Sequence, residues 1–161
     1  MNVLWNILVL VLAIACAGCA SPPATRQHSN HSDETAQIKR RLAEIFDAAQ
    51  KKEMDRLDSY HLYGGAFTKF APGPLGRQDA MAARAGEHDG LGSVSRLSMQ
   101  ADDLKIDIFR DVGIATFILN YSFQAGTNMI EKSERSTLVF VKDRGEWKIV
   151  HEHFSAFKPQ P

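Results

Sequence analysis

The stretch DRGEWKIVHEHFS, residues 143–155, decides how the rest of this chain is interpreted. Its first three residues are turn formers, and an apolar run with alternating side chains follows them. Similar β-rich runs span residues 97–109, 112–123 and 128–141, and the last run itself covers residues 146–157. Short polar or glycine-containing segments separate the runs. These spacings are typical of hairpins, so we expect four antiparallel neighbouring strands.

The segment upstream of these strands has the apolar spacing of helices. Five apolar residues recur on one helical face, and Ser32 or Asp33 is suited to cap the helix that carries them. They are Ile38, Leu42, Ile45, Phe46 and Ala49. We expect a break near Lys51, a second short helix through Tyr60, a short strand at residues 66–70, a third helix at residues 78–88 and a loose segment at residues 90–93. The order predicts an α+β fold, with three N-terminal helices packed on a curved antiparallel sheet.

The N-terminus reads as a bacterial secretion signal. An apolar run at residues 3–15 is followed by Ala17-Gly18-Cys19. This pattern resembles the lipobox of bacterial lipoproteins, in which the cysteine is acylated and becomes the new N-terminus. We therefore expect a signal peptide at residues 1–18, a flexible tether at residues 19–33 with lipid acceptor Cys19, and a folded domain at residues 34–158. Acylation of Cys16 is the alternative register.

The expected anchor implies a place in the cell. Ala20 follows Cys19 at the position where, by resemblance, an Asp signals inner-membrane retention, which favours the outer membrane facing the periplasm. The only cysteines are Cys16 and Cys19, so the folded domain has no disulfide. The 19 basic and 19 acidic residues balance without forming blocks. Because nucleic-acid binding needs concentrated Lys and Arg, we exclude that class of function.

Both faces of the predicted sheet are too apolar for a sheet with one solvated side. Residues 115, 117, 119, 121 and 123 form one apolar face of their strand, and Ile118 interrupts the polar character of the other. One sheet face must pack on the helices, and the other needs a cover as well. We therefore predict a homodimer through the outer sheet face.

Residues 143–155, together with the runs that begin at Asp111 and at Ser136, resemble the C-terminal strands of SnoaL-like domains of the nuclear transport factor 2-like superfamily. The Trp and His-x-His pattern is similar to that of the association domain of calcium/calmodulin-dependent protein kinase II. The resemblance covers residues 35–157. It implies a cone of three helices and a curved sheet around a pocket, and dimers through the outer sheet face.

By this resemblance, alternate residues of three strands face the pocket, and the polar ones among them are candidates to bind a ligand oxygen. These residues are Thr116, Ile118 and Asn120, then Ser136, Leu138 and Phe140, then Val150, Glu152 and Phe154. Tyr60, Tyr63 and Phe67 are expected near the mouth of the pocket. His151 and His153 are expected on the opposite face, at the dimer interface, and His61 near the rim. We predict no metal site and no cofactor, because a metal needs three or four ligands.

Glu152 is the candidate catalytic residue. A carboxylate that faces an apolar cavity has its pKa raised by desolvation, which suits a general base. The alternative is structural, with Glu152 paired to Arg96, Arg135 or Lys148. The first helix lacks the Tyr of ketosteroid isomerases, and no Asp alternates into the expected pocket faces. We therefore favour a membrane-tethered, dimeric module over a cofactor-independent isomerase or lyase. This module either binds a small, mostly apolar molecule in its pocket or serves as an interaction module. A scaffold that docks on an envelope partner is the third possibility.

Overall fold

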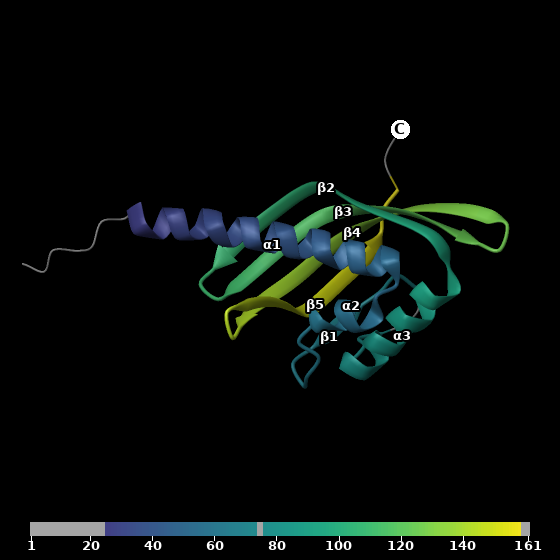
Figure 1. The fold of residues 1–161 in the computed structure, drawn as a ribbon, viewed down its shortest axis with the longest axis horizontal. Helices are drawn as coiled ribbons and strands as arrows, with labels where there is room; N and C mark the ends of the chain where they lie inside the picture. Colours follow the sequence, from purple (N-terminus) through teal and green to yellow (C-terminus); the bar gives the residue numbers. More distant parts are fainter. Residues whose placement is uncertain (1–24, 74–75, 159–161) are drawn as a thin grey trace, which may run out of the picture.

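The computed structural model describes residues 25–73 and 76–158, with side chains from residue 31 onward. The helices are α1 (Thr25–Lys51), α2 (Met54–Ser59) and α3 (Ala80–Ser93). The strands are β1 (Thr68–Phe70), β2 (Ser95–Phe109), β3 (Val112–Ala125), β4 (Asn128–Asp143) and β5 (Glu146–Ala156). Figure 1 shows α1 lying across one face of the sheet, with α2 and α3 grouped near one end of α1. This confirms the α+β fold with helices packed on a curved sheet. The expected signal peptide, Cys16 and Cys19 lie outside the described residues.

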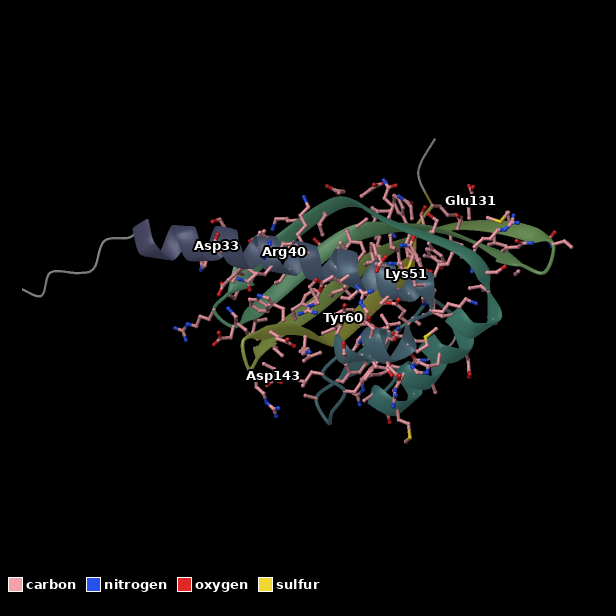
Figure 2. All side chains as sticks on the ribbon, viewed as in Figure 1. Asp33, Arg40, Lys51, Tyr60, Glu131 and Asp143 are labelled. Carbon is pink, nitrogen blue, oxygen red and sulfur yellow. The ribbon has the colours of Figure 1, made fainter. Side chains whose placement is uncertain are left out.

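The long helix α1 follows the predicted apolar face. Buried positions of this face are Ile38, Leu42, Ile45 and Ala49. Charged residues are exposed elsewhere along the helix, and Figure 2 labels three of them, Asp33, Arg40 and Lys51. The helix ends at Lys51, and Lys52 takes a left-handed φ of 58°. Its start differs from the expectation, because α1 begins at Thr25 and not at Ser32 or Asp33. The last part of the expected tether is therefore helical.

The sheet is mixed, and this corrects the expectation of an all-antiparallel sheet. Its five strands lie in the order β1-β5-β4-β3-β2. Strands β2 to β5 are antiparallel neighbours as predicted, but β1 pairs with β5 in parallel. Because β5 pairs with β1 on one side and with β4 on the other, it lies inside the sheet although it is the last described strand.

The edge strand β2 carries two irregularities that bend the sheet. Its register with β3 shifts between Ser95 and Ser98 and again between Asp102 and Lys105. Arg96 and Asp103, inside these two intervals, have φ values of 50° and 52°. Extra residues of this kind kink a strand and increase its twist. The curvature allows the sheet to wrap partly around the end of α1 (Figure 1).

The face of β3 that points to the helices is the opposite of the one expected. Ala115, Phe117 and Leu119 are buried, with exposed fractions of 0%, 4% and 5%. Phe117 meets Phe46 of α1 edge to face, with ring centroids 6.1 Å apart. Thr116, Ile118 and Asn120 are on the outer face, so their prediction as pocket residues is wrong. The physical reason is that the face with the larger apolar area is the one that packs on the helices.

A β-bulge in β5 divides the predicted inner set of that strand. Val139 pairs with His151 and Phe140 pairs with Ile149, so Val150 is an extra residue. The bulge reverses the alternation, and Ile149 therefore lies on the same buried face as Glu152. The prediction that Val150 faces the pocket is wrong, while the inward positions of Glu152 and Phe154 are confirmed. His151 and His153 face outward, as expected.

The backbone at the start of β3 lies close against a side chain of α1. A Cβ placed on Gly113 would lie 2.2 Å from Cδ1 of Ile38, a fully buried side chain of α1. Glycine is the residue that allows such an approach.

Among the described residues, no helix is both long enough and apolar enough to cross a membrane.

Candidate functional site

A cavity of about 140 Å³ lies between the helices and the sheet. Most of its wall is apolar, with contributions from α1, α2, α3 and all four long strands. The apolar lining consists of Ile45, Phe46, Ala49, Leu57, Leu91, Met99, Phe117, Leu119, Leu138 and Phe154. The remaining wall is charged, because His61, Lys69, Glu87 and Glu152 also line the cavity. These four residues are called the charged cluster below.

Strand pairing with β5 places three members of the charged cluster. The backbones of Tyr60 and Leu62 hydrogen-bond to Ile149 at 2.9 and 2.8 Å, and this fixes His61 between them. Lys69 of β1 pairs in register with Glu152 of β5. In-register neighbours of adjacent strands project to the same face of a sheet, so Lys69 and Glu152 meet directly.

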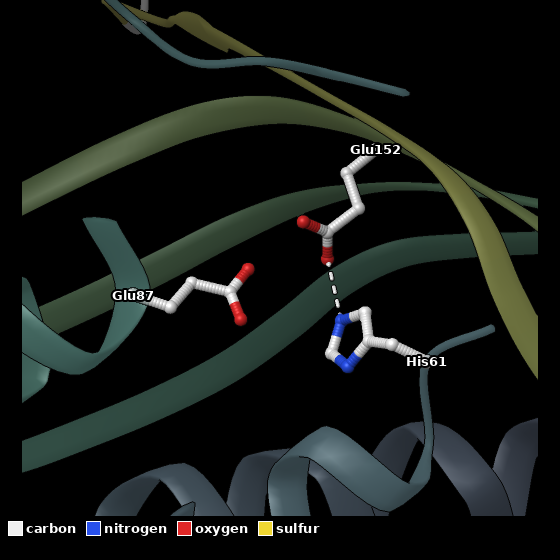
Figure 3. A group of neighbouring side chains, drawn as sticks. All are labelled: His61, Glu87 and Glu152. Atoms are coloured by element: carbon white, nitrogen blue, oxygen red, sulfur yellow. Dashed lines mark hydrogen bonds and ion pairs between the residues drawn. The ribbon is translucent and has the colours of Figure 1, made fainter. Parts of the chain in front are cut away.

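The charged cluster is held together by short polar contacts. Nζ of Lys69 lies 2.8 Å from Oε2 of Glu152 and also forms an ion pair with Glu87. Nε2 of His61 lies 3.3 Å from Oε1 of Glu152, on the other carboxylate oxygen. Figure 3 shows Glu87 reaching from α3 toward the His61–Glu152 pair. Side-chain exposure is only 1% for His61, 6% for Glu152, 11% for Lys69 and 14% for Glu87.

Two aromatic side chains support the charged cluster. The ring of Tyr63 stacks on the imidazole of His61 at a centroid distance of 4.9 Å, and its hydroxyl donates to Glu87 at 3.0 Å. Phe67 packs edge-on against Tyr63 and His61, at 4.8 and 6.0 Å. Tyr63 and Phe67 therefore lie beside the site, as predicted, although neither lines the cavity itself.

The charges of the cluster are set by burial and by mutual contact. Burial raises the pKa of the Glu152 carboxyl, but the ammonium of Lys69 and the hydrogen bond from His61 outweigh it and hold the pKa well below its usual range. Burial lowers the pKa of Lys69, but the carboxylates of Glu152 and Glu87 raise it by more. Both residues are therefore charged at neutral pH. The expectation of a raised pKa for Glu152 is wrong, because Lys69 neutralises it.

The other two members of the charged cluster, His61 and Glu87, both have raised pKa values. Burial lowers the pKa of His61, but the hydrogen bond to Glu152 and the charges of Glu152 and Glu87 raise it overall. Burial and the nearby Glu152 charge raise the pKa of Glu87. Nδ1 of His61 lies 3.0 Å from the backbone oxygen of Leu57, which leaves Nε2 toward Glu152. With Nδ1–H donating to Leu57, a proton on Nε2 makes the ring an imidazolium.

The structure separates the predicted site residues into three groups. Glu152, Leu138 and Phe154 line the cavity, and Ser136 and Phe140 are buried on the same sheet face beside it. Thr116, Ile118, Asn120 and Val150 are on the outer face. Tyr60 is buried elsewhere, with its hydroxyl accepting from Nε of Arg56 at 2.8 Å and the guanidinium of Arg41 over its ring. The expected partners of Glu152, namely Arg96, Arg135 and Lys148, are replaced by Lys69.

Sequence reasoning missed Lys69 and Glu87 and underrated His61. The sequence does hold a signal for Lys69. It lies two residues after the buried Phe67 in the predicted strand at residues 66–70, and residues two apart in a strand point to the same face. Glu87 sits on a helix too rich in Ala and Gly to show a clear apolar face, so no comparable signal marks it. The inward position of His61 could be predicted only from the pairing of its flanking residues with β5.

Three potential metal ligands meet in this cluster. Ligand atoms of His61, Glu87 and Glu152 all lie within 4.8 Å of one another. However, the ammonium of Lys69 contacts both carboxylates and supplies the positive charge that a metal ion would bring. In the described structure the cluster is therefore held together by ion pairs, with Lys69 as the cation between the two carboxylates.

Comparison with known folds agrees with this architecture. A dehydratase, provisionally so classed, from the nuclear transport factor 2-like family of Streptomyces avermitilis superposes with a TM-score of 0.73 and 14% identity, covering 80% of this chain and 99% of that chain. A protein of Novosphingobium aromaticivorans, provisionally classed as a scytalone dehydratase, gives a TM-score of 0.71 at 13% identity, covering 82% and 89% of the two chains. At such low identity these likenesses show the fold alone.

A third solved structure extends the range of relatives. It is provisionally classed as a calcium/calmodulin-dependent kinase II association domain, from Exiguobacterium sibiricum, with a TM-score of 0.65 and 14% identity over 87% of this chain and 98% of that chain. No curated protein matches the sequence. The model of the SnoaL-like domain matches residues 38–159, which include every helix and strand from the middle of α1 onward. The chain therefore belongs to the SnoaL-like domain family.

Proposed function

We propose that the cavity binds one small, mostly apolar molecule whose single polar group faces the charged cluster. The observation that carries this proposal is the composition of the cavity wall, which is apolar except at one end. Ligand sites in proteins typically combine a large apolar lining with a few convergent polar groups that fix orientation. The cluster would supply those polar groups here.

The cavity volume limits the size of the ligand. An engineered apolar cavity of about 150 Å³ accommodates benzene, and the present cavity measures about 140 Å³. A ligand the size of a single six-membered ring with one small polar substituent fits this volume. Lys69, which contacts two carboxylates and lies 5.3 Å from the ring centroid of Phe154, would orient the polar substituent.

Calorimetric titration of the full chain with benzyl alcohol and with benzene tests the proposal. We expect both compounds to bind, and benzyl alcohol to bind more tightly because its hydroxyl reaches the charged cluster. Ala49→Phe places a phenyl group in the cavity and should abolish binding. Ala36→Phe, the same substitution at an exposed position of the same helix, is the matched control and should bind normally. Equal binding by both variants would refute the cavity as the site.

A second candidate function is proton-transfer catalysis, as in a cofactor-independent isomerase or lyase. It is favoured by the raised pKa values of His61 and Glu87, which face each other across the end of the cavity. Glu152 is not the general base in this version, because its pKa is lowered. It would orient His61, while His61 and Glu87 exchange protons with the ligand. The two solved neighbours that are provisionally classed as dehydratases give the same reaction class.

This second function has its own test. Small β-hydroxy ketones, which lose water to give enones that absorb in the near ultraviolet, are offered to the full chain. Turnover that disappears in His61→Phe and survives in the control Ala36→Phe would support catalysis. Tight binding of these ketones without any enone formation would leave the binding function and eliminate the catalytic one.

We also propose that the protein is a homodimer and a lipoprotein of the bacterial envelope. The outer sheet face presents Ile114, Ile118 and Val139, each only partly covered within one chain, which supports pairing through this face. Ile118→Lys should convert a dimer to a monomer in light scattering, and a monomeric parent would refute the dimer. For the anchor, Cys19→Ser should release the protein from the membrane fraction, and Cys16→Ser should not.

A further inference from the structure

Helix α3 forms one wall of the cavity and is held more weakly than the other walls. Of its residues, all of which the structure describes, only Ala83 is buried. Glu87 and Leu91 are the side chains that it contributes to the cavity. Among the described strands and other helices, the one that its backbone contacts most is the short strand β1. A wall with so little buried apolar surface opens at low cost in free energy.

Three glycines lower the intrinsic stability of α3 without serving its packing. A Cβ added at Gly86, Gly90 or Gly92 would meet no atom within 4 Å, and none of the three has a positive φ. Neither close approach nor backbone conformation therefore requires glycine at these positions. Relative to alanine, each glycine in a helix interior weakens the helix by roughly fivefold in its folding equilibrium. Their presence makes α3 easy to unfold locally.

Polar contacts hold α3 in place. Glu87 bonds to Lys69 and Tyr63 on the cavity side. On the outer side, Arg84 and His88 contact Asp58 of α2, with Nη2 and Nε2 at 2.7 and 3.0 Å from its carboxylate oxygens. Side-chain exposure of 53% for Arg84 makes that pair a weak one. The exposed Arg84 pair therefore breaks at low cost, and the buried Glu87–Lys69 pair is the main polar contact that opening has to break.

We propose that α3 is a lid that opens to admit molecules to the cavity while the rest of the fold stays intact. When the lid opens, Glu87 leaves the charged cluster, and Lys69 and Glu152 face the incoming molecule. When it closes, Glu87 returns and completes the polar end of the cavity. The inference deepens the proposed binding function, since it describes how the same cavity is entered.

Thiol labelling tests the lid without any ligand. Ala49 lines the cavity, whereas Ala115 is also buried but lies outside it, with exposed fractions of 4% and 0%, so Ala49→Cys and Ala115→Cys form a pair of probes. The probes are placed in the full chain with Cys16→Ser and Cys19→Ser, and N-ethylmaleimide labelling is followed by mass spectrometry. We expect the thiol at position 49 to react much faster than the thiol at position 115.

Glycine replacements then identify α3 as the moving element. Gly86→Ala with Gly90→Ala should slow labelling at position 49 by about 25-fold, from roughly fivefold at each site, and leave position 115 unchanged. Gly64→Ala with Gly65→Ala is the control outside the helix, where an added Cβ also meets nothing, and should change neither rate. Equal rates at the two probes, or equal slowing of both, would overturn the lid.

Two further readouts keep the outcomes distinct. Backbone amides of α3 in the unsubstituted chain should exchange with deuterium faster than those of α1, and exchange of α3 only by global unfolding would contradict the lid. Saturating benzyl alcohol should slow labelling at position 49. If labelling follows the glycine replacements but benzyl alcohol neither binds nor slows it, the lid stands and the binding function fails.

Discussion

Replacement of Lys69 by methionine isolates the electrostatic role of the charged cluster. Methionine retains the apolar stem and removes the ammonium that lies 2.8 Å from Oε2 of Glu152. Coulomb's law at this distance, with an effective dielectric constant of about 20, gives an attraction of roughly 6 kcal/mol. The substitution also removes the desolvation cost of the ammonium, so we expect a net loss of about 3–5 kcal/mol in the free energy of unfolding at pH 7.

The loss should depend on pH in a defined direction. In the parent, the pKa of Glu152 is lowered, so its stabilisation is present above the unfolded value near 4.3 and declines as the pH falls. In Lys69→Met, His61 remains beside Glu152, and we expect burial to outweigh it and raise the pKa of Glu152 above its unfolded value. Its penalty is therefore full above the folded pKa and vanishes as the pH falls below the unfolded one. The difference between parent and variant should shrink from pH 7 to pH 4.

Urea denaturation of the parent, the single variant and Lys69→Met with Glu152→Gln measures these quantities. We expect the double variant to recover stability to within about 1–2 kcal/mol of the parent, because the deeply buried charge of Glu152 is removed together with its cation, while Glu87 keeps the hydroxyl of Tyr63 as a partner. Lys105→Met is the control, since Lys105 pairs with Asp107 at 70% and 46% side-chain exposure, and should cost less than about 1 kcal/mol. A loss below 1 kcal/mol for Lys69→Met, or no recovery in the double variant, would refute the buried ion pair.

Three further outcomes are expected. In an NMR titration, the pKa of His61 should lie above the usual value near 6.5 and should fall in Glu152→Gln. The stability that protonated His61 contributes is complete below about pH 6.5 and is lost as the pH rises through the folded pKa. A titration midpoint unaffected by Glu152→Gln would exclude the coupling. Gly113→Ala should cost about 1–3 kcal/mol in urea denaturation, since the new Cβ would lie 2.2 Å from Ile38; Ile38→Val in the same chain should restore part of it, and an undiminished stability would contradict the close approach. Ser136→Ala should leave stability unchanged or higher, because the described residues offer its buried hydroxyl no hydrogen bond; a loss above about 1 kcal/mol would reveal a partner.

Local patterns in the sequence predict the elements of this fold well. The spacing of Ile38, Leu42 and Ile45 identifies α1, and the turn at Gly145 identifies the last hairpin. Both signals arise from interactions within a few residues of chain. The family resemblance implied a cone around a pocket. The match of the SnoaL-like model to residues 38–159 confirms the family.

The site was predicted less well, because it depends on register. Face assignments depend on counting residues in steps of two, so the single extra residue Val150 reverses them for Trp147 and Ile149. The charged cluster depends on a parallel pairing of Lys69 with Glu152, residues that are far apart in the chain. No local pattern encodes that pairing, and without it a buried Glu152 looks like a lone carboxylate with a raised pKa.

The central position of β5 has a consequence for how the polypeptide matures. Among the described strands, this one leaves the ribosome last, yet it must insert between β1 and β4, which are synthesised before it. Until that insertion, Lys69 has no Glu152 to meet, and the segment that carries His61 has no backbone partner at Ile149. A nascent chain that stops short of residue 146 is therefore expected to retain an open gap in its sheet, where chaperones or proteases can act. Synthesis of β5 and assembly of the charged cluster then become one event.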